Sequence, residues 1–268
     1  MGDAWSDMLD YLGGDAAWSG NNALQALLWA HVKLSLFAIV VAALVAIPPA
    51  VALGHVRRGG LLAVWIVNVG RAIPSFAIVA LLFPISLRWG FRLGLWPTLI
   101  ALVLLAVPPI FTNTYTGVRD VPPDAVDAAR GMGMRPGELV RKVELPVALP
   151  LVLTGLRVSA VQVVATATLG ALVGYRNLGT PIVSGFQRAN KGPLLAAAIA
   201  VAALALLVDG AFALADRRAI PWRRAAGRQA DVTVDARIDA TIAGSGTPAG
   251  AAAGSGAAAG ATAGSLPG

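Results

Sequence analysis

Five long apolar stretches alternate with polar segments along the chain. They cover about residues 32–53, 61–87, 95–118, 147–173 and 194–215. Each contains the ~20 residues that an α-helix needs to cross the hydrocarbon layer of a membrane. The pattern therefore predicts an all-α protein, a polytopic transmembrane helical bundle of about five spans.

Composition agrees with this fold class and excludes several functions. Of the 268 residues, 57% are hydrophobic and only 13% are charged, whereas about a quarter of a soluble domain is charged. The chain has no cysteine, which excludes disulfides and thiol chemistry. Its two histidines, His31 and His55, stand far apart at the ends of apolar stretches. We expect interfacial histidines there, with no metal site and no cofactor.

The basic residues between the spans predict the orientation of the chain. If there are five spans, twelve basic residues lie on one side, in the turn at 57–58, in the 119–146 segment and after the fifth span, against six on the other. By the positive-inside rule the first side is cytoplasmic, so the amino terminus is outside and the carboxyl terminus inside. No basic run is interleaved with aromatic residues, and nucleic-acid binding is not expected.

The same pattern divides the chain into three parts. Residues 1–22 are polar with three aromatic residues and lack the features of a signal peptide, so we expect a periplasmic or extracellular amphipathic segment at the membrane surface. Residues 23–216 form the transmembrane domain, including the 119–146 segment. Residues 217–268 are a cytoplasmic basic stretch followed by an Ala/Gly-rich tail, which is expected to be disordered and is assigned no role.

Polar residues and prolines inside the spans are candidates for a transport pathway. Arg71 and Arg157 each lie about ten residues into an apolar stretch, where a charge is costly unless it faces a cavity, a partner or the interface. Prolines that interrupt spans are tolerated where neighbouring helices or a cavity satisfy the freed carbonyls, although kinks without such a role are common. For the polar residues, interhelical hydrogen bonding is an equally good explanation. The candidate pathway or gate residues are Arg71, Pro74, Asn113, Arg157, Thr166 and Thr168.

The 119–146 segment predicts two short helices joined by a turn. Asp124, after two prolines, is placed to cap the first helix, which Gly131 and Gly133 end. The second helix begins near Pro136 and runs until Pro146. Two such helices would fit a groove on another protein, with an apolar stripe and a rim of arginines; the stripe is formed by Leu139, Val140 and Val143.

The spacing within this segment resembles the EAA loop of permeases in binding-protein-dependent ABC importers. Asp127-Ala128-Ala129 is followed by three residues, Gly133, nine residues, Val143, one residue and then Leu145-Pro146. Asp127 stands in place of the usual Glu and Val143 in place of the usual Ile. The resemblance implies a cytoplasmic coupling loop that docks on the ATPase through Asp127, Ala128, Ala129, Gly131, Gly133, Leu139, Val143, Leu145 and Pro146.

Further runs extend the resemblance over about residues 24–216. The run 71–76, which contains Arg-Ala-Ile-Pro, is similar to an element of the methionine-type permease fold. The runs 113–118, 129–134, 142–150, 155–157, 165–169 and 174–179 are similar to osmoprotectant permeases, which import glycine betaine, carnitine or choline. The resemblance implies alternating access driven by partner subunits. These are a cytoplasmic ABC ATPase dimer, a second permease as homodimer or paralogue, and an extracellular solute-binding protein.

Two alternatives stay open from the sequence. One is an ABC permease for a methionine-like amino acid or another small solute. The other is a secondary transporter or channel that works without an ATPase, a class that tends to carry internal repeats and a carboxylate within a span. The only acidic residue in the predicted spans is Asp209. The chain has no GxxxxGK[ST] phosphate loop, HExxH or GxSxG motif, so we do not expect it to be an enzyme.

Overall fold

The computed structural model describes residues 2–20, 23–57, 60–69, 74–88, 90 and 94–219. Residues 220–268 form a separate unit that lies outside the described residues, and with it most of the predicted tail. In the described part every regular element is helical, which confirms the all-α class. The elements are α1 (Gly2–Gly13), η1 (Asp15–Ala17), α2 (Leu24–Val56), α3 (Gly60–Val69), α4 (Ser75–Arg88), α5 (Leu95–Arg119), α6 (Pro123–Gly131), α7 (Pro136–Leu139), η4 (Val140–Glu144), α8 (Leu145–Thr166), η5 (Ala167–Val173), α9 (Gly179–Gln187) and α10 (Lys191–Ala219).

Four helical stretches of the described chain are long and apolar enough to cross a membrane. They are Leu24–Val56, Leu95–Arg119, Pro136–Val173 and Lys191–Arg218. Over the predicted second span the structure describes two helices, α3 and α4, of 10 and 14 residues, and residues 70–73 between them lie outside the described residues. At 1.5 Å per residue they reach only about 15 and 21 Å, less than the ~30 Å hydrocarbon layer. Four of the five predicted spans are therefore single continuous helices, and α3 and α4 occupy the predicted second span.

The prolines do not break the other spans as the sequence suggested. Pro48 and Pro49 lie inside the 33-residue helix α2, and Pro108 and Pro109 lie inside α5. Both pairs stay within uninterrupted helices, because neighbouring helices and local adjustments can satisfy the few carbonyls that a proline frees. In the second stretch, Pro74 directly precedes α4.

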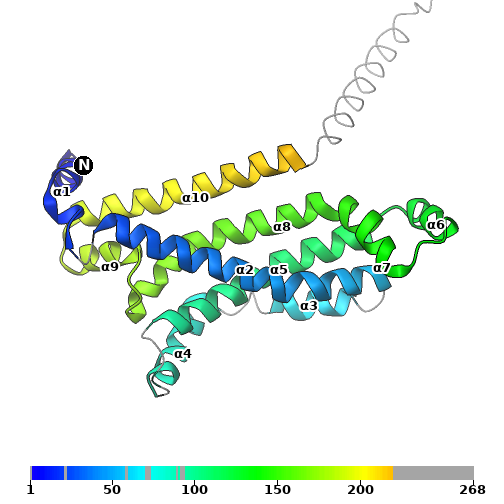
Figure 1. Cartoon of the computed structure of the whole chain (residues 1–268). Helices are drawn as coiled ribbons and strands as arrows, with labels where there is room; N and C mark the ends of the chain where they lie inside the picture. The colour runs from blue at the N-terminus through cyan, green and yellow to red at the C-terminus, as the bar shows by residue number, and fades with distance from the viewer. Residues whose placement is uncertain are drawn as a thin grey trace, which may run out of the picture. The chain divides into compact units, whose positions relative to one another are not determined.

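The core lies where α2, α5 and α8 pack along one another (Figure 1). The face of α2 that they bury carries small residues four apart, Ala38, Ala42, Ala46 and Ala50, each at most 1% exposed. Small side chains let the helix backbones approach closely, which is how helices associate in lipid. The contact between α5 and α8 is similarly tight, because a Cβ on Gly155 would lie 2.8 Å from the Pro109 carbonyl oxygen.

The two ends of the long helices carry different small elements. Within residues 2–219, α1 and α9 lie at one end and α6 and α7 at the other (Figure 1). Helix α1 packs against the start of α10, where Gly192 contacts the backbone of Asp7; its predicted place at the membrane surface stays a prediction. Helix α9 was missed from the sequence, because its nine residues are too short for a span.

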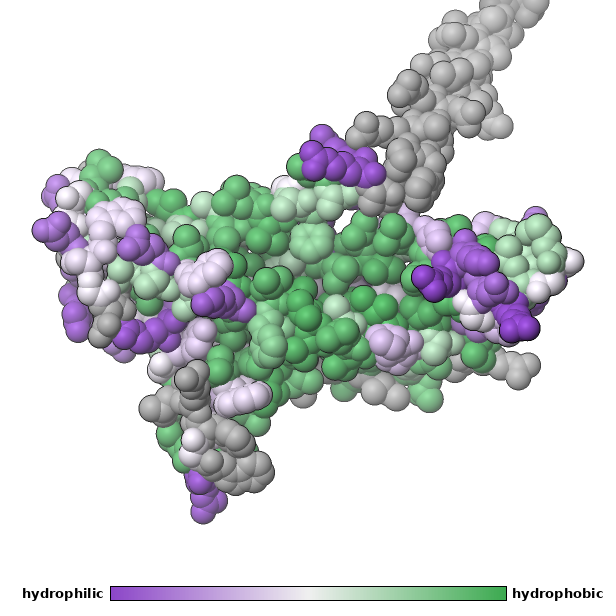
Figure 2. All heavy atoms as spheres, in the orientation of Figure 1, coloured by the Kyte–Doolittle hydropathy of each residue, from purple (hydrophilic) through white to green (hydrophobic). Residues whose placement is uncertain are grey.

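The surface of the described bundle is apolar around its middle and polar at its ends. Figure 2 shows hydrophobic residues over the central part of the helices and hydrophilic residues near the α1–α9 end and the α6–α7 end. The exposed apolar side chains include Leu44, Leu81, Leu206 and Leu207, each at least 69% exposed. Such a band is what contact with lipid requires, whereas a soluble monomer rarely exposes so large a patch.

Candidate functional site: the 119–146 segment and polar residues of the spans

The first helix of the 119–146 segment begins two residues earlier than predicted. Its N-cap residue is Pro122, and Pro123 lies in the first turn, where a missing N–H has no cost. Asp124 therefore does not cap the helix, which corrects the sequence prediction; it lies in the first turn, near the positive end of the helix dipole. Asp127 follows on the exposed face of α6.

Gly133 ends α6 in the way that the sequence predicted. It has φ +81°, in the left-handed region that side chains disfavour. Its N–H donates to the Arg130 carbonyl at 2.9 Å, and the N–H of Met134 donates to the Ala129 carbonyl at 3.2 Å. This pair of bonds is a Schellman motif, which satisfies the last carbonyls of a helix and turns the chain.

The second helix does not end at Pro146. The backbone N–H of Arg135 donates to the Glu138 carboxylate at 3.2 Å and starts α7. The chain then passes through a π-helical turn, η4, into α8 without a break. A proline ring clashes with the carbonyl four residues earlier in a regular helix, and the wider turn directly before Pro146 gives that ring room. The second short helix is therefore continuous with the following span, which corrects the prediction.

Residues of the predicted apolar stripe are packed within the segment itself. Leu139 is 1% exposed and packs with Val121, Val126 and Ala129, while Met134 and Val143 cover the same cluster. This cluster holds α6 against α7. Both helices need such packing, because they are too short to be stable alone. The stripe thus does not face outward as the plug interpretation required. The exposed surface of α6 and its turn is formed by Pro123, Asp124, Ala125, Asp127, Ala128, Arg130, Gly131, Met132 and Gly133.

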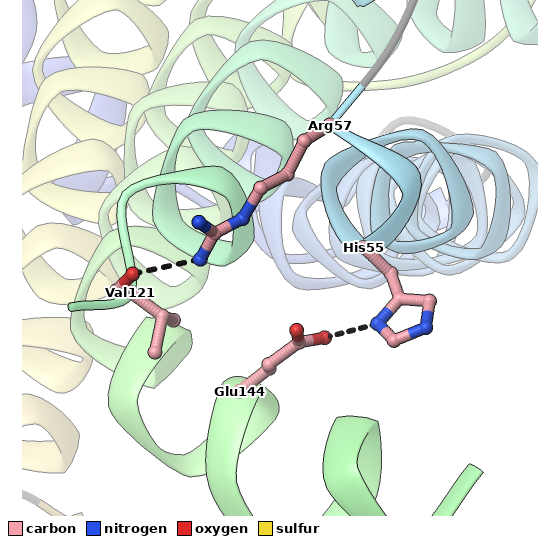
Figure 3. Close-up of polar contacts among 4 residues, drawn as sticks. All are labelled: His55, Arg57, Val121 and Glu144. Atoms are coloured by element: carbon pink, nitrogen blue, oxygen red, sulfur yellow. Dashed lines mark hydrogen bonds and ion pairs between the residues drawn. The ribbon is translucent and has the colours of Figure 1, made fainter. Parts of the chain in front are cut away.

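The last turn of α2 contacts both ends of the segment (Figure 3). His55 Nδ1 and Glu144 Oε2 share a hydrogen bond of 2.8 Å, and Glu144 is only 1% exposed. Arg57 Nη2 donates to the Val121 carbonyl at 2.9 Å. Neither Glu144 nor these contacts could be predicted from the sequence, since the contacts join residues 64 and 89 positions apart. The only local signal was a lone carboxylate beside the Leu-Pro pair.

The candidate pathway residues do not form one site. Asn113 Nδ2 donates to the Pro109 carbonyl at 2.8 Å within α5, and Thr168 Oγ1 donates to the Ala165 carbonyl at 2.9 Å. Thr166 ends α8, Pro74 is exposed before α4, and Arg71 lies outside the described residues. Among those described, none hydrogen-bonds to another. A pathway through them stays a prediction.

Arg157 pairs with Asp209, which lies 52 positions away and could not be assigned to it from the sequence. Its Nε and Nη2 donate to Oδ1 and Oδ2 of Asp209 at 2.6 and 2.7 Å, in the two-pronged geometry that suits guanidinium and carboxylate. The pair joins α8 to α10, and each side chain is 40% exposed. A charge at membrane depth is normally neutralised in this way.

Comparison with known proteins agrees with this architecture. Residues 38–221 match the family described as "Binding-protein-dependent transport system inner membrane component". The choline transport system permease protein OpuBB of Bacillus subtilis is 35% identical over 71% of this chain and 86% of that protein. The carnitine transport permease protein OpuCB of Listeria monocytogenes is 34% identical over 72% of this chain and 86% of that protein.

Solved structures show the same fold at lower identity. An inward-facing structure of the MetNI methionine ABC transporter contains a chain that aligns with a TM-score of 0.63 and 24% identity, over 73% of this chain and 95% of that chain. A crystal structure of an amino acid ABC transporter with histidines aligns with a TM-score of 0.60 and 19% identity, over 73% and 93%. Fold and sequence together define a multi-pass membrane permease of the ABC importer class. The chain belongs to the binding-protein-dependent transport system inner membrane component family.

Proposed function

We propose that this permease imports osmoprotectants of the quaternary ammonium class, such as glycine betaine, carnitine or choline. The observation that carries the proposal is the set of relatives. Each of three permeases at 32–35% identity, aligned over 86% of its own length, is named for choline, carnitine or glycine betaine. A quaternary ammonium ion donates no hydrogen bonds and is recognised by aromatic faces. We place that recognition in the extracellular binding protein and a weakly binding path in this chain.

The energy source in this proposal is a separate ATPase dimer. The resemblance of the 119–146 segment to a coupling loop supports it, and so does the exposed surface of α6 and its turn at one end of the bundle (Figure 1). ATP-driven closure of the ATPase would move this segment and switch the permease between outward and inward access. Four described spans together with α3 and α4 are few for one chain, so a second permease, identical or paralogous, is needed to enclose a path.

The alternative of an ATPase-independent carrier has less support. Such a carrier needs a carboxylate free to bind a coupling ion within the membrane. The acidic residue that the sequence offered, Asp209, is engaged on both oxygens by Arg157. A methionine-like substrate is supported only by likeness of fold, to structures of 24% and 19% identity.

Uptake measurements test the substrate. Cells lacking this permease should lose high-affinity uptake of radiolabelled glycine betaine, choline or carnitine, and should grow poorly in high salt when only these solutes are supplied. The same cells supplied with the gene on a plasmid are the control. Normal uptake of all three solutes together with a collapse of methionine uptake would refute the osmoprotectant proposal and leave the permease class intact.

A further inference from the structure

The last turn of α2 is the only part of that helix whose side chains reach the 119–146 segment through hydrogen bonds among the described residues. Val121, which accepts from Arg57, lies between α5 and α6. Glu144, which pairs with His55, is the last residue of η4 and directly precedes α8. The two contacts therefore hold both ends of the segment (Figure 3). We call the Arg57–Val121 bond the entrance contact and the His55–Glu144 bond the exit contact.

Burial makes the exit contact stronger than an ordinary surface pair. Glu144 is 1% exposed, and the His55 side chain is 22% exposed. A buried carboxylate is costly without a partner, so displacement of η4 away from His55 would leave Glu144 unsatisfied. Helix α2 therefore has to follow η4 or lose this bond.

The backbone conformation at Arg57 restricts where its side chain can lie in the entrance contact. Arg57 caps α2 with φ 56°, in the left-handed region, and its N–H bonds to the carbonyls of Leu53 and Gly54 at 3.1 and 3.2 Å. A residue other than glycine keeps this conformation only where its surroundings hold it there. Just before it, Gly54 packs so closely on α5 that a Cβ would lie 2.8 Å from Val118 Cβ. The end of α2 is thus seated directly on the end of α5.

We propose that the last turn of α2 transmits movement of the 119–146 segment to α2, with His55 and Arg57 as positioning residues. This inference rests on the proposed function, because the movement is the one that the ATPase would impose. Helices α5 and α8 are continuous with the two ends of the segment, whereas α2 is connected to it only across space. Apolar packing alone allows helices to slide, while two directional hydrogen bonds at opposite ends of the segment oppose sliding.

The test measures ATP hydrolysed per solute imported in proteoliposomes that hold the complete transporter, with radiolabelled glycine betaine, choline and carnitine as probes. Arg57→Gly removes the guanidinium and also relieves the left-handed conformation, so backbone strain cannot explain its effect. His55→Leu removes the bond to Glu144. Arg57→Lys and Glu144→Gln keep polar groups at the same places and serve as conservative variants.

For Arg57→Gly and His55→Leu we expect assembly and ATP hydrolysis to persist while the ATP cost per imported solute rises about threefold to tenfold, the range for one lost hydrogen bond. The conservative variants should recover at least part of the ratio. An unchanged ratio of ATP hydrolysed to solute imported would overturn the proposal. A parallel fall of hydrolysis and import would also overturn it, because the contacts would then serve stability alone. If His55→Leu does not reach the membrane, Arg57→Gly decides. An unsubstituted transporter that hydrolyses ATP without importing any probe refutes the proposed substrate instead.

Discussion

Arg157 of α8 and Asp209 of α10 form a two-pronged ion pair, with nitrogen–oxygen distances of 2.6 and 2.7 Å. The pair lies within the membrane-spanning part of the chain. It joins the last span to the central helices, whereas the sequence alone offered Arg157 as a candidate gate residue and Asp209 as the only acidic residue in the predicted spans. A structural role for the pair and a gating role make different predictions.

Breaking the pair should be worse than removing it. Asp209→Asn leaves Arg157 without a counter-charge at membrane depth, so we expect a lower yield of folded protein and a lower thermal unfolding temperature in detergent. Arg157→Leu combined with Asp209→Leu removes both charges and should restore part of that loss. The exposed pair Lys142–Glu138, broken by Lys142→Ala, is the control and should have little effect. A double variant no more stable than Asp209→Asn would contradict this account.

Gly133 should tolerate no side chain although there is space for one. Nothing lies within 4 Å of a Cβ at this position, so the cost comes from the positive φ alone, about 1–2 kcal/mol. Gly133→Val should therefore weaken co-purification of the ATPase and solute-stimulated ATP hydrolysis without preventing membrane insertion. Gly210→Val, in equally open space within α10 and without a positive φ, is the matched control and should behave like the unsubstituted protein. Equal behaviour of the two variants would remove the turn from the coupling mechanism.

Gly155 should be the most sensitive small residue between α5 and α8. A Cβ there would lie 2.8 Å from the Pro109 carbonyl oxygen and 2.9 Å from Asn113 Cβ, so the helices would have to separate. We expect Gly155→Val to destabilise the protein by about 1–3 kcal/mol, measured as a shift of thermal unfolding. Gly210→Ala in α10 meets open space and should be neutral or slightly stabilising. A neutral Gly155→Val would refute the close packing.

Acid should loosen the start of α7. A hydrogen bond from Lys142 and one from the Arg135 N–H lower the pKa of Glu138 below its usual range. Its contribution to stability is therefore fully present above about pH 4.3, the usual value, and is lost as the pH falls through the lowered pKa. Amide exchange over residues 136–143, corrected for its intrinsic pH dependence, should be constant from neutral pH to about pH 5 and accelerate below about pH 4. Glu138→Gln should remove this acid step; the same step in that variant would assign it to another group.

Thiol labelling tests the orientation. The chain has no cysteine, so single cysteines at Ser19, Gly137 and Gly250 can be labelled without interference. A membrane-impermeant reagent applied to intact cells should modify Ser19→Cys and spare the other two, because α1 and α7 lie at opposite ends of the bundle (Figure 1). Permeabilised cells, in which all three should react, are the control. Labelling of Gly137→Cys with protection of Ser19→Cys would reverse the predicted topology.

The 119–146 segment shows which structural features can be predicted from local sequence and which cannot. The turn at Gly133 was predictable, because a glycine after a short helix and before Arg-Pro has few other roles. The end of the second helix was not, because Pro146 reads as a helix breaker and the π-helical turn that accommodates it depends on neighbouring elements. The stripe of Leu139 and Val143 was visible, but its partner was not, since helical spacing identifies an apolar face and leaves open what covers it.

Fold class, membrane location and the permease family could all be deduced from the linear chain. Each depends on features that are local or repeat along it: long apolar runs, basic residues beside them, and one spaced motif. Tertiary structure was needed for the pairing of Arg157 with Asp209 and for the contacts of His55 and Arg57 with the 119–146 segment. These depend on residues between 52 and 89 positions apart, or on neighbouring helices. Hydrophobic period and propensity carry no information on which distant side chains will meet, because that is decided when the helices pack.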